Sequence, residues 1–263
     1  MKKWLAVLLI IIFPGVYFSE NRVETVKDEG INIYLVRHGK TLFNTFDRVQ
    51  GWADSPLTEE GLRVARFVGQ GMKGIRFDRF YVSDAGRHRE TIAAILQQAG
   101  VSDYHLRELK GLREAFFGGF EGDFNENMAA AAAREMGLKD SAALYAGMKS
   151  GALPINEMIN AIAKADDKKL AENYVQIKER TQSALRAIAE TARKEGDKNV
   201  LVVSSGTAMQ IMISDLTNDP DKNKPIANGA VIKIINRDGK YQVSEIGTVR
   251  YIEAGKKTLS TSW

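Results

Sequence analysis

The sequence predicts an α/β fold in which short buried strands alternate with helices. Apolar runs at 31–36, 79–83 and 200–203 each end abruptly in polar residues and glycine, and a helical pattern follows. The chain has 263 residues, of which 44% are hydrophobic, and this is enough to form the core of one large domain. We therefore expect one α/β domain at 31–250, with a helical insertion at about 125–165.

The mildly basic charge suits an anionic substrate or an anionic cell surface. The formal net charge is +4, and no run of lysine and arginine interleaved with aromatic residues indicates a nucleic-acid-binding surface. The chain has no cysteine, which excludes disulfides and thiolate zinc sites. Its three histidines, His38, His88 and His105, lack the spacing of metal ligands. The sequence thus predicts no nucleic-acid partner, no metal and no cofactor.

Residues 1–20 have the pattern of an export signal. Basic residues at 2 and 3 precede the apolar stretch Trp4–Phe13, and a Pro14-Gly15 break follows. Bulky aromatic residues crowd the expected cleavage site after Ser19, so an uncleaved N-terminal anchor is the alternative to a signal peptide. Both interpretations predict an exported protein, periplasmic or extracellular, and the second adds association with the membrane.

The first core strand, 31–36, leads directly into Arg37-His38-Gly39. Ligands of open α/β sheets bind beyond the carboxyl ends of the strands, so Arg37 and His38 would lie at the mouth of a site. Gly39 would let the backbone turn away. Taken alone, the triplet is more typical of a polar turn at the surface, and only the later segments favour a site.

The second strand, 79–83, also runs into polar residues, and a helix from about Arg87 to Ala99 follows. Arg87 would lie at the N-terminus of this helix, where the helix dipole and free N–H groups favour an anion. A solvated first-turn arginine explains the position equally well. Between the two strands, Thr58 is a suitable N-cap for a helix that continues to about Met72.

The middle of the chain changes character. A third strand or extended segment is expected at 106–112, and a loop rich in glycine and aromatic residues follows it around Glu114. The insertion at about 125–165 contains short helical patterns broken by glycines and a proline. A longer amphipathic helix is predicted at about 168–194.

The last third returns to the sheet pattern. The fourth strand, 200–203, opens at Ser204-Ser205-Gly206 into a helix that continues to about Leu216. A hairpin is expected between 231–235 and 241–246, at the edge of the sheet. The chain after Glu253 is expected to form a loose tail.

Seven segments share an order, a spacing and a strand-end context that are specific in combination. They are RHGKT with Asn44, DSPLTEEG within 51–61, SDAGRHRET, the Glu114 loop with FGGFEG, Arg180, VVSSG, and Asn228-Gly229-Ala230-Val231. Together they resemble the histidine phosphatase superfamily, in its phosphoglycerate mutase-like branch, from about Ile31 to Ile246. The resemblance implies a three-layer α/β/α sandwich with a mostly parallel sheet and no metal.

The resemblance also implies roles for individual residues. His38 matches the nucleophile that attacks a phosphate ester and forms a phosphohistidine. Arg37 and Arg87 match the guanidinium groups that hold the phosphate, and Asn44 matches a further phosphate contact. Glu114 matches the proton donor, which protonates the leaving group and then activates water. The small phosphorylated substrate is the expected partner.

One departure from the family pattern affects the expected rate. Ser205 stands where the family has a second histidine, and we expect Ser205 and the Gly206 backbone to contact the phosphate with neutral donors at a helix N-terminus. Losing one charge-stabilising group typically costs ~10²- to 10³-fold in rate. We therefore expect reduced activity, and a gain when Ser205 is replaced with histidine.

Three function classes follow from these observations. The first is an exported phosphomonoesterase that works through a phosphohistidine at a reduced rate. The second is a catalytically impaired relative that binds a phosphorylated ligand. The third is a phosphoglycerate mutase, against which export and Ser205 both argue. In each class, the insertion at 125–165 is expected to cover the pocket and select the substrate.

Overall fold

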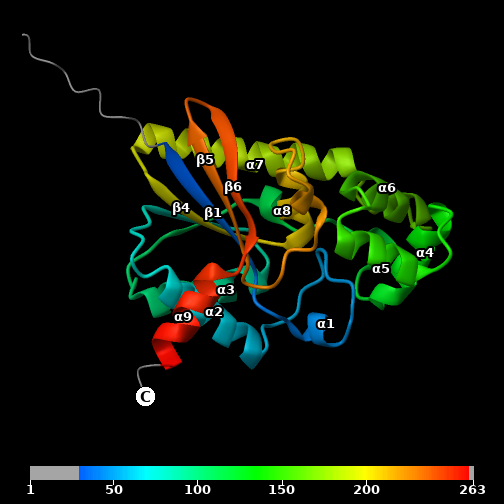
Figure 1. The fold of residues 1–263 in the computed structure, drawn as a ribbon, viewed down its shortest axis with the longest axis horizontal. Helices are drawn as coiled ribbons and strands as arrows, with labels where there is room; N and C mark the ends of the chain where they lie inside the picture. Colours follow the sequence, from blue (N-terminus) through cyan, green and yellow to red (C-terminus); the bar gives the residue numbers. More distant parts are fainter. Residues whose placement is uncertain (1–29, 261–263) are drawn as a thin grey trace, which may run out of the picture.

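A six-stranded sheet forms the centre of the computed structural model, which describes residues 30–260 (Figure 1). The strand order is β3-β2-β4-β1-β5-β6. The first four strands in this order run parallel to one another, and β5 pairs antiparallel with both β1 and β6. The expected mostly parallel α/β/α fold is confirmed. The signal or anchor predicted at 1–20 lies outside the described residues. The strands are β1 (Ile31–Arg37), β2 (Arg79–Val82), β3 (Leu106–Glu108), β4 (Asn199–Ser204), β5 (Val231–Arg237) and β6 (Lys240–Thr248).

Helices cover both faces of the sheet, because alternate side chains of each buried strand point to opposite sides. Ile33 of β1 packs in the core cluster shared with α7 and α8, whereas Tyr34 packs in the cluster shared with α2, α3 and α9. The central parallel strands β1, β2 and β4 are therefore buried and mainly apolar on both faces, whereas the edge strand β3 is not. The helices on the sheet are α2 (Glu59–Gly71), α3 (Gly86–Ala99), α7 (Tyr174–Glu195), α8 (Gly206–Met212) and α9 (Arg250–Ser260).

Three helices of the insertion pack together beside the sheet and form a third apolar cluster (Figure 1). The helices are α4 (Asn125–Glu135), α5 (Ser141–Ser150) and α6 (Ile155–Ala165). Gly137, Gly151 and Pro154 lie between them as predicted, but Gly147, also predicted as a break, lies within α5. Within residues 30–260, no helix combines the length and the apolar character needed to cross a bilayer.

The long helix is shorter than predicted at its start. It was expected from 168, but it begins at Tyr174, where Asn173 forms a capping box with Gln176. Upstream, the buried carboxylate of Asp166 accepts backbone N–H groups from four residues and holds 168–171 in a loop. Satisfying this buried charge prevents the helix from extending backwards.

Two other predicted elements are also shortened. The third strand ends at Glu108, because the chain then turns into a 3-10 helix, and α8 ends at Met212 rather than near Leu216. The short helices are α1 (Leu42–Thr45) and the 3-10 turns Lys110–Leu112, Gly118–Phe120 and Pro220–Asn223.

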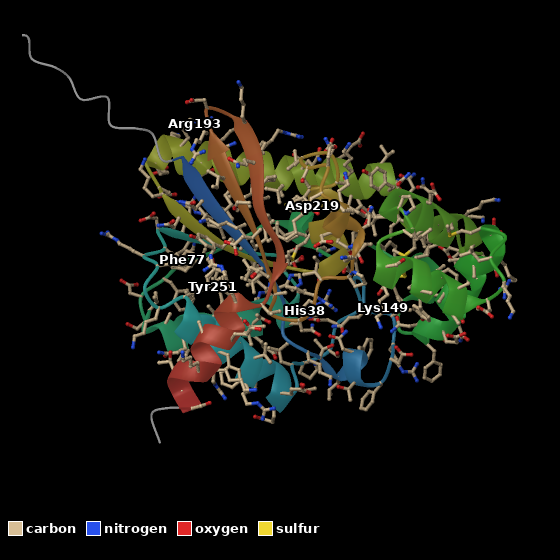
Figure 2. The ribbon with its side chains drawn as sticks, viewed as in Figure 1. His38, Phe77, Lys149, Arg193, Asp219 and Tyr251 are labelled. Atoms are coloured by element: carbon tan, nitrogen blue, oxygen red, sulfur yellow. The ribbon has the colours of Figure 1, made fainter. Side chains whose placement is uncertain are left out.

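The loose tail predicted after Glu253 is wrong for residues 254–260, which belong to α9. Tyr251 is buried and meets the ring of Tyr34 at a centroid distance of 6.2 Å (Figure 2 labels Tyr251). Glycines allow α9 to touch α2 closely: a Cβ on Gly255 would lie 1.9 Å from the carbonyl oxygen of Phe67. The amphipathic pattern of 250–260 was the signal that could have identified the helix.

Replacing Gly255 with alanine is expected to lower the free energy of unfolding by about 1–3 kcal/mol, the usual cost of overpacking a close contact. The matched control is Gly74→Ala, because no atom lies within 4 Å of a Cβ at that position. Urea denaturation of both variants measures the difference. Equal stability of the two variants would contradict the packing of α9 on α2.

Candidate active site

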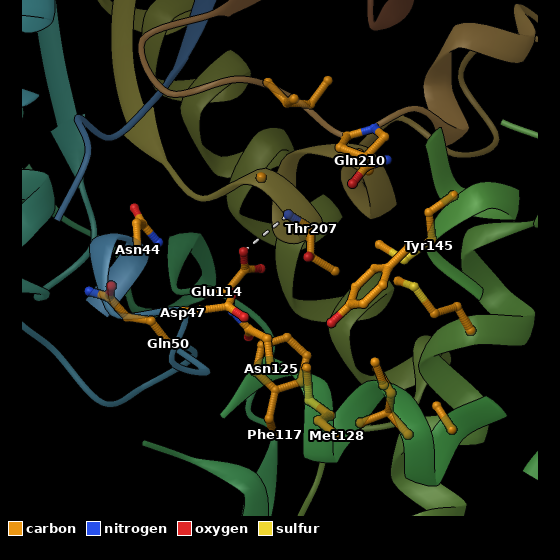
Figure 3. A pocket seen from close by; sticks show the side chains of 18 of the residues that line it. Asn44, Asp47, Gln50, Glu114, Phe117, Asn125, Met128, Tyr145, Thr207 and Gln210 are labelled. Carbon is orange, nitrogen blue, oxygen red and sulfur yellow. Dashed lines mark hydrogen bonds between the residues drawn. The ribbon is translucent and has the colours of Figure 1, made fainter. Parts of the chain in front are cut away.

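A pocket of about 440 Å³ opens where β1 and β4 end (Figure 3). One end is polar and includes most of the residues that the sequence predicted for the site. The other end is formed by the insertion helices α4, α5 and α6. The polar lining comprises Arg37, His38, Asn44, Asp47, Arg48, Gln50, Glu114, Asn125, Thr207 and Gln210.

His38 follows β1 directly and lies near the middle of the molecule (Figure 2). Its Nδ1 is 2.8 Å from the carbonyl oxygen of Gly39. A carbonyl only accepts, so Nδ1 carries the hydrogen and Nε2 keeps its lone pair. Burial lowers the pKa of His38 well below its ordinary value, and the charges of Arg87 and Arg37 lower it further. The imidazole is therefore neutral and nucleophilic at neutral pH.

Gly39 is required by a close contact with α2, a role that the sequence did not predict; its φ does not lie in the left-handed region. A Cβ at this position would lie 2.7 Å from the carbonyl oxygen of Gly61 at the start of α2. The backbone N–H of Gly39 donates to the Thr91 hydroxyl on α3 at 3.0 Å. These two contacts clamp the turn that carries His38 between α2 and α3.

The side chain of Arg37 packs against Gly206, the first residue of α8. Its Nη1 donates to the Ile226 carbonyl at 2.5 Å, whereas its Nε is buried and has no hydrogen-bond partner within residues 30–260. Burial lowers the pKa of Arg37, the nearby Glu114 raises it, and Arg87 lowers it. Arg37 therefore brings an unsatisfied N–H donor into the site.

Arg87 projects from the first turn of α3 and is only 1% exposed. Its Nη1 donates to Asp54 at 2.9 Å, and its Nη2 donates to the Gly51 carbonyl at 2.7 Å. The Nε is buried and unpaired in the described chain, as in Arg37. An unsatisfied buried donor costs about 1–3 kcal/mol, and a bound anion between the two arginines would remove this cost.

Glu114 reaches the N-terminus of α8. Its Oε1 accepts the N–H groups of Ala115 and Ala208, each at 2.8 Å, and its Oε2 accepts that of Thr207 at 3.1 Å (Figure 3). Glu114 thus uses the N–H groups of Thr207 and Ala208, whereas the predicted contact of the Gly206 backbone with a phosphate stays a prediction. Oε2 has only one such bond and keeps a lone pair for a proton.

Asn44 lines the pocket from α1. Its side-chain carbonyl accepts the backbone N–H of Thr41 in a capping box and also lies 3.4 Å from the Asn228 amide nitrogen. These bonds leave the amide NH₂ of Asn44 as the donor that can face a ligand. The structure therefore brings Arg37, His38, Asn44 and Glu114 to one pocket, with Arg87 immediately behind.

A model of the histidine phosphatase superfamily (branch 1) matches residues 33–248. The chain belongs to this superfamily. The resemblance seen in the sequence is thereby confirmed. The match covers all of the sheet except the first two residues of β1, together with the insertion, so all of the predicted site residues lie within it.

Several proteins that are similar to this chain are named as mutases or phosphatases. The crystal structure of phosphoglycerate mutase from Bacillus anthracis str. Sterne is 37% identical, with a TM-score of 0.81 over 87% of this chain and 98% of that chain. Phosphoserine phosphatase in complex with 3-phosphoglyceric acid from Entamoeba histolytica shares the fold at 21% identity, with a TM-score of 0.61 over 84% of this chain and 99% of that chain. The probable phosphoglycerate mutase GpmB of Yersinia pestis (strain Pestoides F) is 44% identical over 82 residues, which span 30% of this chain and 38% of the length of GpmB.

Two further residues stabilise the site, and the sequence predicted no individual role for either of them. Glu121 accepts the backbone N–H groups of 51–53 and so fixes the loop whose carbonyls hold Arg87. Arg180 on α7 donates to the carbonyl of Glu114 at 2.7 Å and to Glu172. The position of each within a matching segment was the available signal.

Ser205 lies deeper than predicted. It is fully buried, it is not part of the pocket lining, and its hydroxyl oxygen is 2.8 Å from Nε2 of His88. Its predicted contact with phosphate, and its replacement of a family histidine, stay predictions. His88, for which the sequence predicted no role, is thus an immediate neighbour of the site. Its ring stacks on that of His38, with the ring centroids 5.5 Å apart.

Proposed function

We propose that the chain is an exported phosphomonoesterase that hydrolyses esters with an apolar or aromatic alcohol through a phosphohistidine. The pocket carries this proposal: the neutral His38 and Glu114 lie at one end, and an apolar wall faces them. A charged or highly polar alcohol would find few partners at that wall. The wall consists of Phe117, Met128, Ala129, Ala132, Leu144, Met148, Met158 and Ile162, with the phenol of Tyr145 as its one polar side-chain group within residues 30–260.

The proposed reaction has two steps. Nε2 of His38 attacks phosphorus, and the new P–N bond replaces the P–O bond to the alcohol, while Glu114 in its acid form protonates the leaving oxygen. Glu114 as carboxylate then takes a proton from water, whose oxygen displaces His38 and releases inorganic phosphate. Arg37 and Arg87 would neutralise the charge on the phosphoryl oxygens throughout.

The second candidate, a phosphoglycerate mutase, is favoured by one observation in the pocket. Arg48 lines it, donates to the Gly122 carbonyl at 2.8 Å and lies over the Phe124 ring. This guanidinium is the group that a carboxylate of phosphoglycerate would approach. The names of the relatives support the same candidate. The third candidate, an impaired phosphate-binding relative, depends on Ser205 giving too little stabilisation for turnover.

Rates with p-nitrophenyl phosphate, 1-naphthyl phosphate, glycerol phosphate and 3-phosphoglycerate test the proposal. We expect the aryl esters to be hydrolysed fastest and a chelator to leave the rates unchanged, since two arginines neutralise the phosphate and no group of acidic, histidine or cysteine residues within 30–260 is arranged to hold a metal. Faster isomerisation of phosphoglycerate than ester hydrolysis would establish the mutase. Phosphate binding without any hydrolysis would establish the impaired relative.

The exported location rests on the pattern of residues 1–20 alone. Cell fractionation tests it, and the full-length chain in the soluble cytoplasmic fraction would contradict it.

A further inference from the structure

A chain of three buried side chains lies behind His38. The Ser83 hydroxyl at the end of β2 is 2.7 Å from Nδ1 of His88, and Nε2 of His88 is 2.8 Å from the Ser205 hydroxyl. All three side chains are fully buried. The Ser205 oxygen also lies 3.4 Å from Nη2 of Arg87. The two-step reaction proposed above uses neither Ser83 nor His88, so this chain of contacts has no assigned purpose.

Counting hydrogens shows that the chain has two states. The Ser83 oxygen already accepts the N–H of Ala85, and its single hydrogen has Nδ1 of His88 as its acceptor. In this state His88 carries its hydrogen on Nε2 and donates to Ser205. The hydroxyl hydrogen of Ser205 is then free to be donated elsewhere.

The opposite state leaves the hydroxyl hydrogen of Ser83, instead of that of Ser205, without a partner among the described residues. If Nδ1 of His88 carried the hydrogen, Ser205 would donate to Nε2, and the Ser83 hydrogen would have no acceptor among its contacts in the described chain. A buried polar hydrogen without a partner is costly. A phosphoryl oxygen beside Arg87 can accept a hydrogen from Ser205 only in the first state, so a bound phosphate selects that state.

We propose that His88 is a positioning residue that acts through Ser205, turning its hydroxyl hydrogen toward the phosphoryl group. This inference rests on the proposed function. His88 and Arg87 both donate to the Ser205 oxygen, so the Ser205 hydroxyl can act only as a donor toward a third group. Burial, with the charge of Arg87, lowers the pKa of His88 well below its ordinary value, so the ring is neutral and has a defined tautomer.

The same geometry changes one expectation from the sequence. Ser205→His was expected to increase activity, but the space beside Ser205 is filled by the fully buried ring of His88. We now expect the single substitution to lower activity, because two imidazoles would overlap. The exchange variant His88→Ala with Ser205→His removes this overlap and returns one imidazole to the site.

The tautomer of His88 is measured by ¹⁵N NMR of histidine-labelled protein, which has only three histidines. With inorganic phosphate added, we expect His88 in the wild type to show a single Nε2–H tautomer, and this selection to be lost in Ser205→Ala. The exposed His105 serves as the internal control. A shift of the His38 signal with His88 in the Nδ1–H form would overturn the inference. No response of His38 to phosphate would instead count against the proposed function.

Turnover of p-nitrophenyl phosphate gives the second test. We expect Ser205→Ala and His88→Ala each to lower kcat by about 10²-fold with little change in KM, because the donor acts on charge that develops in the transition state. The double alanine variant should be no slower than either single variant, since the two residues act as one unit. The exchange variant should regain at least about 10-fold over His88→Ala.

A purely structural role for His88 predicts different results. The two alanine substitutions would then multiply their losses, and the exchange variant would recover nothing; either result would overturn the inference. Thermal unfolding shows which variants fold. If His88→Ala does not fold, Ser83→Ala carries the test, because it removes the bond to Nδ1 and leaves both His88 and Ser205 in place. We expect a loss of about 10-fold in kcat, and an unchanged kcat would contradict the inference.

Discussion

Replacing His38 with alanine is expected to abolish hydrolysis, with a loss of about 10⁴-fold or more, the scale seen when a covalent nucleophile is removed. No other side chain in the pocket offers an unprotonated nitrogen to phosphorus: Arg37 and Arg48 are cations, and the Gln50 side chain is an amide. Phosphate binding should persist, because the arginines remain. Rate measurements and mass spectrometry under alkaline quench, which preserves phosphohistidine, test both statements.

The pH dependence of the same group has a defined direction. The pKa of His38 is lowered in the folded protein, so the neutral nucleophile is lost only when the pH falls through a value well below 6.5. The acid limb of kcat/KM that is due to His38 should lie in that range. His105→Ala is the matched control for His38→Ala, because it removes an exposed histidine outside the pocket. If the His38→Ala variant turned over substrate as fast as the His105→Ala control, the phosphohistidine mechanism would be contradicted.

Protonation of the buried histidines also affects stability. Both His38 and His88 have folded-state pKa values below 6.5, and the unfolded chain therefore binds more protons than the folded chain once the pH falls below 6.5. Their contribution to the free energy of unfolding should decrease as the pH falls through this range. Above it, both groups are neutral in both states and this dependence vanishes.

Replacing Glu114 with glutamine is expected to lower kcat by about 10²- to 10⁴-fold for esters with a poor leaving group, because the amide cannot deliver a proton. The loss should be much smaller with p-nitrophenyl phosphate, whose leaving group needs little protonation. The amide NH₂ would also face N–H groups of α8 that now donate to the carboxylate, and the free energy of unfolding should fall by about 1–3 kcal/mol.

Glu157→Gln is the matched control for this substitution, because Glu157 is an exposed carboxylate on α6. Rates for a series of phenyl phosphates with different leaving groups measure the effect. A loss that is the same for every leaving group would show that Glu114 positions the site without transferring a proton.

The sequence predicted the parts of the fold that depend on local patterns. The strand at 31–37 and the breaks between α4, α5 and α6 follow from apolar periodicity and from glycine and proline. The pairing of His88 with Ser205 joins residues 117 positions apart, and the bond from Ala208 to Glu114 spans 94 positions. No spacing rule encodes such contacts, because they arise only when strand ends meet at one edge of the sheet.

The two ends of the pocket have different origins in the chain, and this has an evolutionary consequence. The polar end is assembled from separate stretches around 37–50, 114 and 206–210, so a mutation in any one of them would disturb the proposed chemistry. The apolar wall comes mainly from the single stretch 125–165. Under the function proposed above, a duplication, deletion or recombination confined to that part of the gene would change which alcohol is accepted while leaving the polar end intact. New specificities can thus arise in one genetic step.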